Sequence, residues 1–117
     1  MLKEEKKILR IVDSLNAYCL YVGAKNFSTK IEKHNKHWII IVESDFKEKY
    51  KKSILEFKER LNAIDCRDTE EMFWTMIGSV EFEDDNDIDV VGCMVDCEEI
   101  VVENNHFQAT LIRKKEY

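Results

Sequence analysis

The spacing of apolar residues over the first third of the chain predicts a helix followed by two strands. Between residues 3 and 22, apolar side chains recur at intervals of three and four, which places them along one side of an α-helix. Gly23 then ends the helix, because glycine accepts the left-handed conformation that closes many helices. Beyond it the period changes to two. We therefore expect strands at Phe27–Lys33 and His37–Val42, joined as an antiparallel hairpin.

The middle of the chain returns to the helical period. Phe46–Asn62 has apolar residues at helical spacing with Lys and Glu on its other sides, and Glu43-Ser44-Asp45 offers capping side chains before it. A shorter third helix is expected from Asp68 to Gly78. Glu71 stands three residues after Asp68, as in a variant of the capping box.

The last third of the chain predicts a further short element and a hairpin. The β-branched residues of Ile88–Cys97 favour a strand, whereas the spacing of its apolar residues fits one side of a helix, and we favour the helix. Strands Glu98–Glu103 and His106–Arg113 should then form a hairpin around Asn104-Asn105. Asparagine tolerates the positive φ of a tight two-residue turn.

These elements together predict an α+β fold in the order α-β-β-α-α-α-β-β. A sheet needs one face covered and each helix needs its apolar side buried. A two-layer sandwich, with the helices packed on one face of a mostly antiparallel four-stranded sheet, satisfies both needs. No linker, repeat or low-complexity tract interrupts the 117 residues, so we expect residues 1–117 to be a single domain.

Composition and charge exclude several classes of partner. The chain is 44% hydrophobic and 36% charged, as a globular protein is, and its formal net charge is −6. An acidic chain without a basic stripe is not expected to bind nucleic acid. The longest apolar run, Trp38–Val42, is too short to cross a membrane, and the first residues lack the layout of a secretion signal. We therefore expect a cytoplasmic protein that binds neither nucleic acid nor membrane.

The candidate metal-binding and catalytic residues each have a simpler structural interpretation. Alternate aspartates in Asp85–Asp89 resemble the first ligands of a calcium loop, but Val90 occupies the position where that loop requires glycine. Cys93 and Cys97 lie one helical turn apart, and a metal would need two more ligands to converge on them. The chain has no C-x-x-C pair, nucleophile elbow or P-loop. We expect neither a metal site nor catalytic residues.

Four segments follow one another in an order that one known family shares. They are Leu15-Asn16-Ala17, Gly23-Ala24-Lys25 with the strand after it, Ile39–Asp45, and Val90–Val95 before the last hairpin. In element order they resemble the Asn-rich box, the entry into the first strand, the Asp-x-Gly-x-Gly region and the helix after the nucleotide lid of the histidine-kinase-type ATPase (GHKL) domain. Neither the glycines of the Asp box nor a glycine-rich phosphate box is present, so the resemblance is to a degenerate member.

The resemblance implies a ligand site as well as a fold. Asn16 would stand where the family holds magnesium, and Ser44 or Asp45 would stand near the adenine-binding Asp. ATP with magnesium would be a cofactor only if this degenerate site still binds it, and we expect no dedicated cofactor. Hydrolysis would lack a convincing base.

Three functional hypotheses follow from the sequence. The first is a non-enzymatic regulatory or protein-interaction module on the ATPase-like sandwich, acting as a homodimer or on another protein through an apolar surface that includes Tyr50, Phe73 and Trp74. The second is a weak nucleotide- or small-ligand-binding domain with vestigial or no hydrolysis, in which Asn16 and Asp45 line the pocket. A cysteine-dependent enzyme ranks third, because no motif surrounds any of the cysteines.

Overall fold

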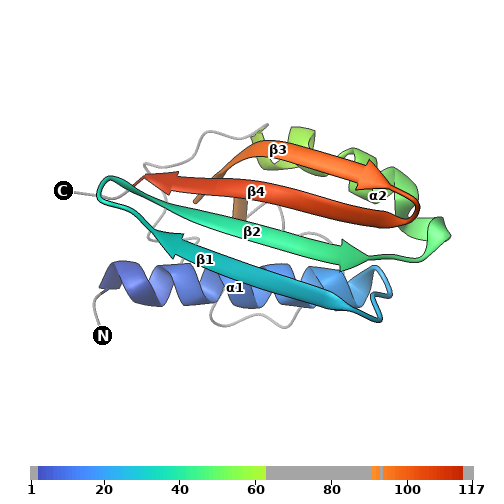
Figure 1. Cartoon of the computed structure of the whole chain (residues 1–117), viewed down its shortest axis with the longest axis horizontal. Helices are drawn as coiled ribbons and strands as arrows, with labels where there is room; N and C mark the ends of the chain where they lie inside the picture. Colours follow the sequence, from blue (N-terminus) through green and yellow to red (C-terminus); the bar gives the residue numbers. More distant parts are fainter. Residues whose placement is uncertain (1–2, 63–90, 93, 115–117) are drawn as a thin grey trace.

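The computed structural model describes residues 3–62, 91–92 and 94–114 and shows a mixed α+β fold (Figure 1). An antiparallel sheet of four strands forms one layer, and helices form the second, which confirms the predicted fold class. None of the helices in the described part of the chain is long and apolar enough to cross a lipid bilayer. The elements are α1 (Lys3–Tyr21), β1 (Phe27–Lys33), β2 (His37–Asp45), the 3-10 turn η1 (Glu48–Tyr50), α2 (Lys51–Leu55), α3 (Phe57–Asn62), β3 (Asp96–Glu103) and β4 (His106–Lys114).

The four strands lie in the order β1-β2-β4-β3, and every neighbouring pair is antiparallel. β2 and β4 are therefore the central strands, whereas β1 and β3 are the two edges. The pairing of β1 with β2 is continuous from Phe27↔Ser44 to Lys33↔Trp38. The pairing of β3 with β4 is interrupted by a register shift between Cys97 and Glu99.

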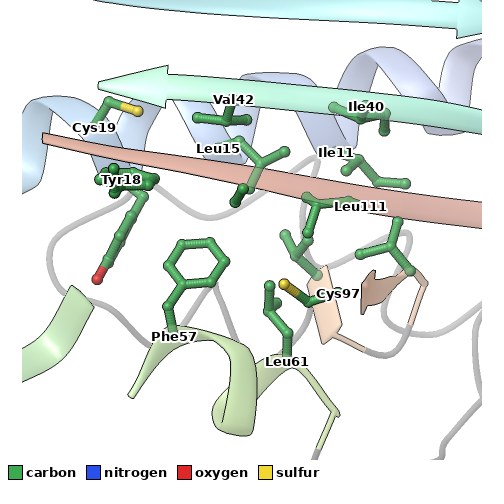
Figure 2. Close-up of a cluster of buried hydrophobic side chains, with 14 of the residues drawn as sticks. Ile11, Leu15, Tyr18, Cys19, Ile40, Val42, Phe57, Leu61, Cys97 and Leu111 are labelled. Atoms are coloured by element: carbon green, nitrogen blue, oxygen red, sulfur yellow. The ribbon is translucent and has the colours of Figure 1, made fainter. Parts of the chain in front are cut away.

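The hydrophobic core lies between one face of the sheet and the helices. Alternate residues of the central strands are buried, as expected for a sheet with one covered face. Figure 2 shows this face in contact with side chains of both α1 and α3, so the helices cover the same side of the sheet. The labelled core residues include Ile11 and Leu15 of α1, Ile40 and Val42 of β2, Phe57 and Leu61 of α3, and Leu111 of β4.

The first helix and both predicted hairpins are confirmed. α1 ends before Gly23, which has φ +81°, and the backbone N–H of Ala24 bonds back to the carbonyl of Cys19 at 3.0 Å. The last hairpin turns through Asn104 (φ 51°) and Asn105 (φ 59°), the left-handed pair that a tight hairpin turn requires.

The region predicted as one helix, Phe46–Asn62, is divided. β2 continues to Asp45 instead of ending at Val42, so the expected capping segment is strand. Backbone hydrogen bonds from Phe46 to Asn105 (3.0 Å) and from Lys47 to Val22 (2.9 Å) then keep the chain extended before η1, α2 and α3 begin. The apolar residues that predicted the buried side of this helix are nevertheless buried: Ile54 in α2, and Phe57 and Leu61 in α3.

Two further predictions fall partly or wholly outside the described residues. In Ile88–Cys97, the described residues Val91 and Gly92 are helical, but Asp96 and Cys97 already belong to β3. The predicted third helix, Asp68–Gly78, lies outside the described residues.

Candidate functional site

The three residues proposed to bind a ligand each have a partner within the protein. The side-chain oxygen of Asn16 accepts a hydrogen bond from the Thr29 hydroxyl at 2.7 Å, which joins α1 to β1. Ser44 is fully buried and donates to the carbonyl of Asp45 at 2.7 Å. The Asp45 carboxylate accepts the backbone N–H groups of Lys25 (2.7 Å) and Asn26 (3.2 Å). It therefore holds the turn between α1 and β1.

The charge on Asp45 is favoured by this geometry. Partial desolvation raises the pKa of Asp45, but the N–H donors of Asn26 and Lys25 and the positive potential of His106 outweigh it, so the net pKa is lowered. The hydrogen bonds from this turn therefore stabilise the ionised form of the Asp45 carboxylate, which has a structural role.

A shallow cleft of about 430 Å³ adjoins Asp45. Its described lining includes Lys25, Lys47, Asn104 and Asn105, but neither Asn16 nor Ser44. The structure therefore does not bring the three predicted ligand-binding residues to one described cavity.

The predicted interaction surface is described only at Tyr50. This residue is half-buried, and its ring lies 5.2 Å from the ring of Tyr21 and 5.1 Å from the Lys49 ammonium. Phe73 and Trp74 lie outside the described residues. Tyr50 therefore joins η1 to the end of α1.

The described cysteines are core groups. Cys19 and Cys97 are free thiols and are buried, and burial raises the pKa of each thiol to about 11. A hydrogen bond with Ser44 offsets only part of the rise at Cys19. Within the described ranges, no three His, Cys, Asp or Glu side chains are grouped as a metal site would require.

Four exposed apolar side chains that were not predicted as a site lie on β1 or on the side of α1 that faces it. We call Leu9, Leu20, Phe27 and Ile31 the edge patch; their exposed fractions are 48%, 63%, 36% and 38%. Leu9 and Leu20 lie on the same side of α1 as Asn16, since they are seven and four residues away from it, or about two turns and one turn. Asn16 contacts β1 through Thr29, so this side of α1 faces the β1 edge.

A small apolar cavity lies within this surface. It has a volume of about 240 Å³ and is lined by Glu5, Ile8, Leu9, Ile31 and Trp38. Lys33 lies beside it, with its ammonium 3.7 Å from the Glu5 carboxylate and 5.2 Å from the Trp38 ring. The cavity thus lies between the beginning of α1, the end of β1 and the beginning of β2.

The backbone of β1 also offers hydrogen-bonding groups at this edge. The N–H of His34 bonds to the carbonyl of His37 (2.9 Å), and the N–H of Asp45 bonds to the carbonyl of Asn26 (3.2 Å). Alternate residues of an antiparallel strand bond to the same neighbour, so the even-numbered residues between 26 and 34 face β2. No described strand pairs with the other side of β1. The backbone groups directed to that side belong to Phe27, Thr29, Ile31 and Lys33.

The opposite edge of the sheet differs in both charge and regularity. β3 has the register shift between Cys97 and Glu99, and an irregularity of this kind discourages pairing with another strand. β3 carries four acidic residues and no lysine or arginine, so its charged side chains are all negative: Asp96, Glu98, Glu99 and Glu103. β1 is therefore the edge of the sheet better suited to binding another strand.

Part of this edge could have been found in the sequence. Leu9 and Leu20 fall off the apolar side of the first helix, and two leucines displaced to one other side indicate a second contact surface. That Phe27–Lys33 would be the outermost strand could not be found, because it depends on how β2 and β4 pair.

Comparison with protein-family models, with curated proteins and with solved structures found no significant match in any of the three. The resemblance to the histidine-kinase-type ATPase domain therefore stays a prediction from element order.

Proposed function

We propose that this protein is a non-enzymatic interaction module that binds an extended protein segment along the free side of β1. The observation that carries the proposal is that exposed apolar side chains and outward-directed backbone groups occur together on one side of the molecule. An extended segment added to a sheet edge gains affinity from main-chain hydrogen bonds and specificity from side-chain contacts.

Both contributions are needed at this edge. A hydrogen bond formed in place of one to water contributes only about 1 kcal/mol net, so backbone pairing alone would bind weakly. Burial of the edge patch adds the hydrophobic term, at about 25 cal/mol per Å² of apolar surface removed from water. The cavity between Ile8, Leu9, Ile31 and Trp38 would receive one apolar side chain of the bound segment.

The proposal is tested by photo-cross-linking in the cells that produce the protein. A benzophenone amino acid at Phe27, on the edge patch, should cross-link to another polypeptide, because the side chain is exposed and belongs to the edge strand. The matched control places the same amino acid at Val101 of β3, which is 49% exposed. Equal cross-linking from both positions, or none from position 27, would contradict the proposal.

The cleft at Asp45 supports a second candidate, a small-ligand-binding domain derived from the ATPase-like sandwich. Its volume of about 430 Å³ is in the range of ligand pockets. Its lining holds two lysines, Lys25 and Lys47, which could pair with an anionic group, beside the carboxylates of Asp45 and Glu48. A thermal-shift titration with ATP or ADP, with and without magnesium, tests this candidate. A saturable shift abolished by Lys47→Ala would favour it, and no shift at millimolar nucleotide would exclude nucleotide as the ligand.

A further inference from the structure

We infer that the segment bound by β1 is β1 of a second copy of this chain, paired antiparallel about a two-fold axis at Ile31. The inference rests on the proposed function, since it names the partner of the same edge. Two four-stranded sheets would join into one continuous sheet of eight strands.

The backbone allows this pairing. A two-fold axis perpendicular to the sheet keeps the helices of both copies on the same side and opposes residues of the same face. The outward-directed groups of Thr29, Ile31 and Lys33 must therefore meet outward-directed groups of the second copy. A register in which the two-fold axis passes beside Thr29, Lys30 or Ile31, called here pairing about that residue, fulfils this requirement. In each of these registers, odd-numbered residues of one copy lie opposite odd-numbered residues of the other.

The charges of β1 select one of these registers. Pairing about Lys30 places two lysines directly opposite each other, which is destabilising. Pairing about Thr29 opposes Lys30 to Ser28 of the second copy and leaves its charge unmatched. Pairing about Ile31 opposes Lys30 to Glu32 of the second copy, and the symmetry forms the same pair again. Lys30 and Glu32 already lie 3.3 Å apart within the strand, so four alternating charges would form one cluster.

The apolar side chains favour the same register. Ile31 lies on the helix-facing side of β1, and its counterpart in the second copy would lie directly opposite it across the axis. Leu9, on the adjoining side of α1, lines the same cavity as Ile31, so the axis passes beside this cavity.

The test is a charge exchange read out by sedimentation equilibrium of the purified protein over about two orders of magnitude in concentration. The unaltered protein should show a monomer–dimer equilibrium. Lys30→Glu and Glu32→Lys should each weaken self-association about tenfold or more, because each places like charges opposite each other at two positions. The controls Lys52→Glu and Glu59→Lys make the same charge changes at exposed positions of α2 and α3 and should leave the dimer unchanged.

Mixing tests the register itself. In the pairing about Ile31, an equimolar mixture of the Lys30→Glu and Glu32→Lys proteins restores both pairs of opposite charge, so the mixture should form heterodimers. The double variant K30E/E32K should likewise form homodimers again. No other register of β1 predicts both results.

Three outcomes would overturn the inference. They are a monomer at every concentration, a dimer unaffected by either single charge reversal, and a mixture that fails to associate. A purified monomer whose position 27 still cross-links a different polypeptide in cells would overturn the second copy as partner and leave the interaction module standing. Absence of both association and cross-linking would overturn both proposals.

Discussion

The side-chain amide of Asn62, at the end of α3, forms both backbone hydrogen bonds that a neighbouring strand would form to Cys97. Its nitrogen donates to the Cys97 carbonyl at 2.9 Å, and its oxygen accepts the Cys97 N–H at 2.9 Å. Cys97 stands at the register shift of β3. One asparagine therefore anchors α3 to the beginning of β3.

We expect Asn62→Asp to lower the free energy of unfolding by about 1–2 kcal/mol. An aspartate can still accept the Cys97 N–H, but it places an acceptor against the Cys97 carbonyl and loses one hydrogen bond. Urea denaturation monitored by fluorescence measures the change. Glu59→Gln, at an exposed position of the same helix, is the control and should have little effect. Equal stability of Asn62→Asp and the unaltered protein would show that the paired hydrogen bonds contribute nothing.

Gly92 is expected to tolerate no side chain. A Cβ at this position would lie 2.7 Å from the carbonyl oxygen and 3.0 Å from the Cα of Leu61, both backbone atoms of α3. Since the backbone cannot move aside as a flexible side chain can, Gly92→Ala should cost about 1–3 kcal/mol. The melting temperature reports the change, and an unchanged value would mean that α3 can move away from this segment without cost.

The stability contributed by Asp45 should depend on pH. Its pKa is lowered in the folded protein, so its contribution is present above the unfolded value of about 3.9 and is lost as pH falls through the folded value. Asp45→Asn should therefore be less stable than the unaltered protein at pH 7 by about 1 kcal/mol, and the difference should shrink toward pH 3.

Chemical denaturation across this pH range measures the contribution of Asp45. Asp13→Asn removes the same charge from an exposed position of α1 and serves as the control. A difference between Asp45→Asn and the unaltered protein that stays constant with pH would contradict the assigned role of the carboxylate.

Cys19 and Cys97 should react slowly with alkylating reagents in the folded protein. A thiol with a pKa of about 11 is almost entirely protonated at pH 7, and both thiols are buried. We expect iodoacetamide to label each of them at least about 100-fold more slowly than in urea, where the pKa returns to about 8.5. Mass spectrometry of the peptides measures each rate. Rapid labelling of either thiol in the native protein would instead favour a nucleophilic cysteine.

The elements that could be predicted are those whose cause is local. Apolar spacing predicts α1 and the strands β1 and β4, because the repeat of a helix or strand shows which of its sides is apolar. At β1 the apolar side is not buried: Phe27 and Ile31 remain 36% and 38% exposed. Gly23 and the pair Asn104-Asn105 likewise determine their turns through their own backbone preferences. The inward-facing residues of β4 were predictable for the same reason, whereas the apolar run of β2 does not show that its residues alternate in burial.

Contacts between distant parts of the chain decided the rest. β2 continues to Asp45, and the region after it begins extended, because Phe46 and Lys47 bond to Asn105 and Val22. The side chains of Asn16 and Asp45 are engaged by Thr29 and by the backbone at residues 25–26, partners that no local pattern names. β1 is an edge of the sheet within the described part of the chain because β2 pairs with β4 on its other side. Periodicity fixes the face that a residue occupies, whereas strand order depends on long-range pairing and determines which edge is left to bind another chain.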